Sequence, residues 1–98
     1  MRLTGKLKES FIDWLQDNKP TTIKSVIIGW HETDSTLFQS MAFALLEDFL
    51  FEEGWIVQVS YQVKLNRWYY YIHNQEMDYE KTKEEAITKA IQYLNDNY

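Results

Sequence analysis

Few residues in this chain have side chains suited to catalysis. It has no cysteine, which excludes disulfides, thiolate nucleophiles and cysteine metal sites, and it has only two histidines. His31 lies near Glu32 and Asp34, which are types that could bind a hard cation, but a polar loop capping the next helix explains them better. His73 has no serine in a triad pattern, and no nucleotide-binding or hydrolase motif occurs. We therefore expect a non-enzymatic protein that holds neither a metal nor a cofactor.

Acidic side chains gather toward the end of a predicted helix. Residues 31–54 contain six acidic residues and no basic one, and four of the six are Glu47, Asp48, Glu52 and Glu53. Carboxylates near a helix C-terminus oppose the helix dipole and cost a few tenths to about 1 kcal/mol each. Such a departure from the local rule is worth testing as a functional site. We predict these four residues as an acidic partner-binding patch, unless Lys64, Arg67 or lysines of the first helix neutralise them.

A predicted hairpin follows this helix. Residues alternate from Trp55 to Val63, with Trp55, Val57, Val59, Tyr61 and Val63 on one face and Gln58, Ser60 and Gln62 on the other. A second strand covers Arg67–His73. A four-residue turn places Val63 opposite Trp68, Tyr61 opposite Tyr70 and Val59 opposite Ile72. We prefer it to a two-residue turn, which would require a positive φ at Leu65.

This register gives the hairpin a polar, aromatic outer face. Arg67, Tyr69, Tyr71 and His73 then lie beside the glutamines. Because tyrosine and arginine are enriched at protein interfaces, we predict Arg67, Tyr69 and Tyr71 as partner-binding residues. Two alternatives stay open. A helix could cover this face, or the tyrosines could stack on single-stranded bases, although a net charge of −5 argues against nucleic acid.

Three helices are predicted around the hairpin. The first spans residues 5–17, with Thr4 as its cap, and the second runs from about residue 35 to Glu53, with Gly54 after its end. Apolar residues of the second helix cover an arc of roughly 200°, so we expect burial on two sides. The third spans residues 83–96 and begins with the capping box Thr82-Lys83-Glu84-Glu85.

The order of elements predicts an α+β fold. Residues 21–30 are rich in β-branched side chains and favour a strand, whereas residues 74–81 read as a polar connection. The predicted order is therefore α-β-α-β-β-α, with a three-stranded mixed sheet and helices packed on it as a two- or three-layer sandwich. A chain of 98 residues fits a single domain over residues 1–98.

The sequence composition also predicts the cellular compartment of the protein and the kind of partner that it binds. The N-terminus has no apolar run typical of a signal peptide, and the most apolar stretch is too short to span a bilayer. We expect a cytoplasmic protein that binds another protein or a second copy of itself. The alternative is a nucleic-acid-related protein, either a base-stacking sheet or an acidic mimic of DNA.

Residues 35–94 resemble the small phage "ABA sandwich" type of domain. The resemblance lies in the helix that ends Glu52-Glu53-Gly54-Trp55, in the aromatic hairpin, and in the Thr82–Ile87 segment followed by Ala90-Ile91. It implies a phage or prophage protein with an accessory or host-interacting role. It supplies no catalytic residues.

Overall fold

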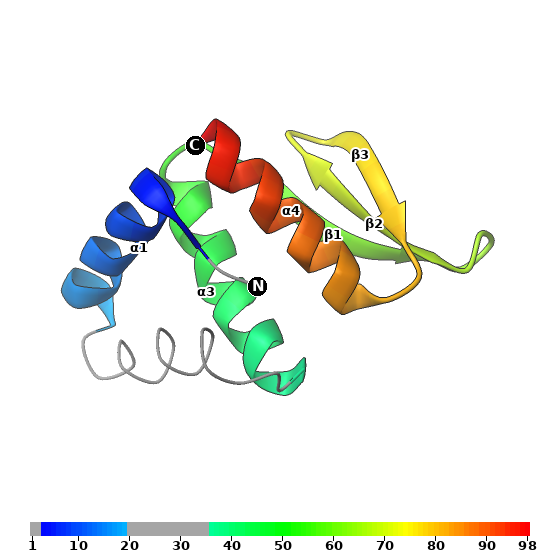
Figure 1. Cartoon of the computed structure of the whole chain (residues 1–98), viewed down its shortest axis with the longest axis horizontal. Coiled ribbons are helices and arrows are strands. Elements are labelled where there is room, and N and C mark those ends of the chain that lie inside the picture. Colours follow the sequence, from blue (N-terminus) through cyan, green and yellow to red (C-terminus); the bar gives the residue numbers. More distant parts are fainter. Residues whose placement is uncertain (1–2, 20–35) are drawn as a thin grey trace.

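The structure, a computed structural model, describes residues 3–19 and 36–98 and has an α+β architecture (Figure 1). Its elements, in chain order, are α1 (Gly5–Asn18), α3 (Thr36–Glu52), β1 (Val57–Gln62), β2 (Arg67–Ile72), β3 (Gln75–Glu80) and α4 (Lys83–Asn97). The predicted α+β class with a three-stranded sheet is confirmed. The predicted strand at residues 21–30 lies outside the described residues, as do His31, Glu32 and Asp34.

The helix ends follow the local signals in the sequence. After α3, Gly54 has a φ of 89°, and the N–H of Trp55 donates to the Leu50 carbonyl at 2.8 Å, which closes the helix as a glycine cap does. At the start of α4, the Thr82 hydroxyl accepts the Glu85 N–H at 3.2 Å. Thr4 is the N-cap residue of α1 as predicted, but its side chain makes no capping hydrogen bond.

The sheet differs from the prediction in its third strand. The strand order is β1-β2-β3, and both pairings are antiparallel, so the described sheet is a meander rather than the expected mixed sheet. The third strand is Gln75–Glu80, within the segment predicted as a polar connection. As an edge strand β3 is largely solvated, which explains why it lacks the apolar content that would have identified it.

The β1–β2 register has the predicted parity but is shifted. Tyr61 pairs with Trp68, Val59 with Tyr70 and Val57 with Ile72, so the turn comprises residues 63–66 instead of residues 64–67. The predicted turn and the observed turn both have four residues, so the same side chains share each face of the hairpin as predicted. Asn66, with a φ of 52°, takes the left-handed position that the shifted turn requires.

All described helices lie on one side of the sheet. In Figure 1, α4 crosses the sheet, α3 lies beside α4, and α1 lies farthest from the strands. Helix α4 contacts all three strands, α3 contacts β1, and α1 contacts α3 and α4. Helix α3 thus packs between α1 on one side and β1 and α4 on the other, which confirms its expected two-sided burial.

The core fills the space between these helices and one face of the sheet. Its buried members are Leu3, Leu7, Phe11, Leu15, Ala42, Phe43, Leu46, Phe49, Leu50, Val57, Tyr70, Ile72, Ile87, Ala90, Ile91 and Leu94. The sheet contributes Val57, Tyr70 and Ile72, all on the face predicted to point inward. None of the helices in residues 3–19 and 36–98 is both long and apolar enough to cross a membrane.

Candidate functional site

The sheet face opposite the helices is the first candidate site. Strand pairing places Arg67, Tyr69 and Tyr71 of β2 on this face, between Gln58, Ser60 and Gln62 of β1 and the side chains of β3. No described helix covers it, because α3 and α4 pack on the opposite face. The three predicted residues are therefore together on one surface. We call it the tyrosine face: Gln58, Ser60, Gln62, Arg67, Tyr69, Tyr71, Glu76 and Tyr79.

Tyr69 is at the centre of the tyrosine face but is almost inaccessible. Only 7% of it is exposed, because it packs between Tyr71 and Tyr79 at ring-centroid distances of 6.4 and 5.6 Å. Burial, assisted by the nearby Glu76 carboxylate, raises the pKa of Tyr69. Tyr69 therefore supports the surface, and its neighbours are the rings that can meet a partner.

Tyr79 is the residue that the sequence interpretation missed. It pairs with Tyr69 across β2 and β3 and is 53% exposed, which makes it the most accessible ring on this face. The sequence does contain a pattern typical of a strand here, since Met77 and Tyr79 alternate with acidic residues. That short alternation was masked by the polarity of residues 74–81.

Hydrogen bonds fix the border of the tyrosine face. Gln62 Nε2 donates to the Tyr71 hydroxyl at 2.9 Å, which holds that ring against β1. Arg67 Nη1 donates to the Asn66 carbonyl at 3.0 Å, so the guanidinium is held beside the turn. The face therefore offers ordered aromatic rings, amides and one cation at fixed positions.

His73 does not belong to the tyrosine face, contrary to expectation. The β2 strand ends at Ile72, and His73 occupies the following turn with a φ of 51°. Its ring stacks on Trp55 with centroids 5.2 Å apart, and its backbone N–H donates to the Ile56 carbonyl at 2.7 Å. It thus ties the β2–β3 turn to the start of β1.

The four predicted acidic residues of α3 have separate structural environments. Trp14 Nε1 donates to Glu52 Oε2 at 2.8 Å, and the Tyr98 hydroxyl donates to Glu53 Oε1 at 3.0 Å. Glu47 is half-buried, and this burial, followed by repulsion from Asp48, raises its pKa. The donors to Glu52 and Glu53 are an indole and a hydroxyl, not the lysines or Arg67 considered from the sequence.

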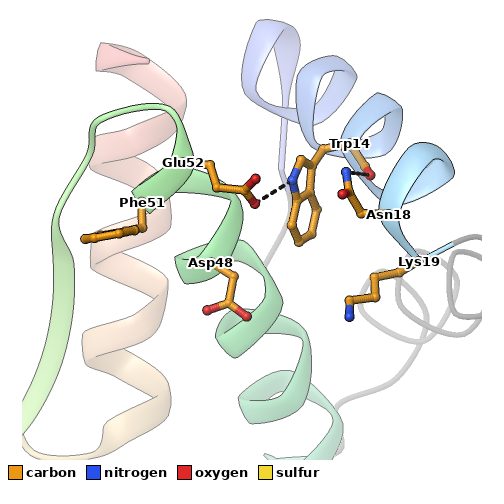
Figure 2. Close-up of a pocket in the computed structure, with 6 residues that line it drawn as sticks. All are labelled: Trp14, Asn18, Lys19, Asp48, Phe51 and Glu52. Atoms are coloured by element: carbon orange, nitrogen blue, oxygen red, sulfur yellow. Dashed lines mark hydrogen bonds between the residues drawn. The ribbon is translucent and has the colours of Figure 1, made fainter.

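Helices α1 and α3 enclose a shallow pocket beside these acids. Its volume is about 410 Å³, and it is lined by Trp14, Asn18, Lys19, Asp48, Phe51 and Glu52. Figure 2 shows the Trp14 indole facing Glu52, while Phe51 projects from α3 away from Trp14. Phe51 is 70% exposed, as predicted for an aromatic residue at a helix end. Asp48 and Glu52 line this pocket together, whereas Glu47 and Asp48 line a second hollow at the start of β1.

Neither a metal centre nor a family likeness adds to this picture. Within residues 3–19 and 36–98, no group of three or more histidine, aspartate or glutamate side chains could hold a metal ion. Comparison with protein-family models, with curated proteins and with solved structures gave no match to the chain.

Proposed function

We propose that the chain is a non-enzymatic protein-binding module that contacts its partner through Tyr79, Tyr71 and Arg67. The observation that carries this proposal is the exposed Tyr79 ring, packed on the buried Tyr69 ring on a sheet face that no described helix covers. A tyrosine held in place in this way loses little conformational entropy on binding. The proposed partner is a protein, because Glu76 and the net charge of −5 oppose a phosphate backbone.

The family resemblance extends the proposal to a biological setting. A phage or prophage accessory protein with a host-interacting role would present such a surface to a protein of the host cell. That setting is a separate part of the proposal, since the tyrosine face can bind a partner in any cell.

A photo-cross-linking amino acid at position 79 tests the contact surface. The probe is benzoyl-phenylalanine in place of Tyr79, and its control is the same probe in place of the exposed Gln92 on α4. We expect position 79 to yield discrete protein adducts in the producing cell and position 92 to yield none of them. Arg67→Ala in the position-79 protein should reduce the adduct yield several-fold, because arginine is a frequent hot-spot residue.

Two results would contradict this function. Identical adducts from both positions would show contact without a preferred face. Fluorescence anisotropy that detects binding of a labelled single-stranded oligonucleotide, weakened by added salt and lost in Tyr79→Ser, would instead assign the tyrosines to base stacking.

A further inference from the structure

The two edges of the sheet differ in how they are protected. Strand β3 carries three carboxylates, Glu76, Asp78 and Glu80, and has an irregularity in its pairing with β2 next to Tyr70 and Tyr71. Charges and bulges of this kind prevent an edge strand from pairing with another chain. Strand β1 has the sequence Val-Gln-Val-Ser-Tyr-Gln, with no charge and no proline. Its edge therefore has none of these protections.

Exposed apolar side chains concentrate along the same strand. Among the described residues, the exposed large apolar side chains are Phe51, Ile56, Tyr61, Val63, Leu65 and Tyr79. Four of them lie on β1 or directly beside it, and Phe51 of α3 lines the hollow at the start of β1. Val63 is 80% exposed and Leu65 is 60% exposed, both in the turn that follows β1. Clustering of this kind is typical of a surface that becomes covered by a partner.

The backbone of β1 is oriented to accept a further strand. His73 N–H donates to the Ile56 carbonyl, and Ile56 N–H donates to His73 Nδ1, so Ile56 directs its backbone groups toward His73 as a residue of a hydrogen-bonded pair does. Because such pairs alternate along an antiparallel ladder, Gln58, Ser60 and Gln62 direct their backbone groups toward β2. Val57, Val59 and Tyr61 direct theirs outward, to an edge that no described strand occupies.

We propose that β1 pairs with β1 of a second copy of this chain, antiparallel and about a two-fold axis at Val59. In this register Val59 meets its own copy, and Val57 meets Tyr61 of the second copy. Every outward-facing residue of one strand then bonds to an outward-facing residue of the other. The result is one continuous antiparallel sheet with the tyrosine face of each copy on the same side.

The ends of the strand provide the complementarity that favours a second copy over an unrelated peptide. A hollow of about 190 Å³ lies between α3 and the start of β1, lined by Glu47, Asp48, Phe51, Trp55, Ile56 and Val57. The proposed register places Val63 of one copy opposite Trp55 of the other, at this hollow. Figure 2 shows that Phe51 points from α3 away from α1, so its ring is available on this side.

Charge at the same contact is also complementary. Lys64 follows Val63 in the exposed turn, and the hollow that receives the turn carries the Glu47 and Asp48 carboxylates. A two-fold axis makes this contact twice, once at each end of the paired strands. The acidic end of α3, unfavourable for the helix itself, thereby gains a cation from the second copy.

Sedimentation velocity across a concentration series tests the pairing. We expect a reversible monomer–dimer equilibrium in the wild type, and Val63→Glu and Lys64→Glu each to raise the dissociation constant by about tenfold or more, because each places a carboxylate beside the acidic hollow. Lys81→Glu is the matched control for Lys64→Glu, since it makes the same charge change on an exposed loop between β3 and α4. The charge-exchanged protein Lys64→Glu/Asp48→Lys should recover part of the lost affinity.

Amide hydrogen exchange locates the contact. At dimer-forming concentration, exchange should slow at Val57, Val59 and Tyr61 and stay unchanged at Gln58, Ser60 and Gln62, whose amides β2 already protects. Thermal melts establish that the variants fold. We expect them to fold because Val63 is highly exposed, so its replacement removes few buried contacts.

A wild type that stays monomeric at every concentration tested overturns the proposal. So does a dimer that Val63→Glu and Lys64→Glu leave intact. A dimer lost in Tyr79→Ser but kept in Val63→Glu would move the self-contact to the tyrosine face. The protein-binding function proposed above is tested at position 79, so either proposal can fail while the other survives.

Discussion

Lys89 is the cation that links α4 to β3. Its Nζ lies 2.8 Å from Asp78 Oδ2 and 2.6 Å from Glu80 Oε1. The hydrogen bond from Lys89 lowers the pKa of Asp78, and the two carboxylates raise the pKa of Lys89. Because the pKa of Asp78 is lower in the folded protein than its unfolded value of 3.8, the Asp78–Lys89 ion pair stabilises the fold above pH 3.8. This stabilisation is lost as the pH falls through the folded pKa of Asp78.

Replacing Lys89 with methionine should lower the free energy of unfolding in a pH-dependent way. The apolar stem is kept while the charge is removed. We expect the difference from the wild type to be constant from about pH 5 to pH 9, because the raised lysine pKa keeps the amine charged over that range. It should shrink as Asp78 is protonated. Urea unfolding at a series of pH values measures it.

Lys81→Met is the control for this experiment. Lys81 is exposed in the loop before α4, so its replacement should leave the unfolding free energy nearly unchanged at every pH. A Lys89→Met difference that persists undiminished at pH 2 would show that packing of the lysine stem, and not its charge, is responsible.

The tyrosines show how far residue types alone could identify the site. The sequence placed Tyr69 and Tyr71 on the face opposite the core, since parity depends only on alternation and on an even turn. It could not distinguish the buried Tyr69 from the exposed Tyr79, because that difference depends on β3 lying beside β2. The hydrogen-bond partners of Glu52 and Glu53 could not be predicted either, since Trp14 and Tyr98 are distant from them in the sequence.

Among the elements, the β2–β3 connection depends on two residues in left-handed backbone. The turn comprises His73 and Asn74, with φ values of 51° and 66°, between the paired residues Ile72 and Gln75. Positive φ at both central residues is typical of the tight turns that match the twist of a hairpin. Asparagine tolerates this conformation better than most residues with a side chain.

Asn74→Ala should therefore destabilise the protein by about 1 kcal/mol, because alanine pays the full cost of left-handed backbone. Asn74→Gly is the matched variant, since glycine adopts this φ freely and should leave stability unchanged or slightly raised. Urea unfolding of the two variants measures the contrast. Equal stability of the two variants would show that the turn relaxes to another conformation.

The elements with strong local signals were predictable and the remaining one was not. Helices α1 and α4 are set by apolar spacing and, for α4, by the Thr82 cap, and their predicted bounds differ from the observed ones by one residue at the C-terminal end. Strand β3 has weak signals because an edge strand needs polar residues to stay unpaired. Since an edge strand that stays unpaired usually carries polar or charged residues, the uncharged edge of β1 supports the strand pairing proposed above.

For the molecule as a whole, α4 is the element that joins the two layers. It contacts all three strands on one side and both α1 and α3 on the other. Its buried stripe consists of Ala86, Ile87, Ala90, Ile91 and Leu94. Because neither the helical layer nor the sheet buries its apolar face without α4, the two layers should unfold together.

Ile91→Ala tests this cooperativity. Ile91 is 1% exposed, so truncation removes buried methyl groups and leaves a cavity at a cost of about 2–5 kcal/mol. The neighbouring Gln92 is exposed, and Gln92→Ala should stay within about 0.5 kcal/mol of the wild type. Far-UV circular dichroism and tryptophan fluorescence should give one shared transition in all three proteins, shifted only in Ile91→Ala. If the fluorescence transition of Ile91→Ala precedes the loss of helix signal, the molecule does not unfold as one cooperative unit.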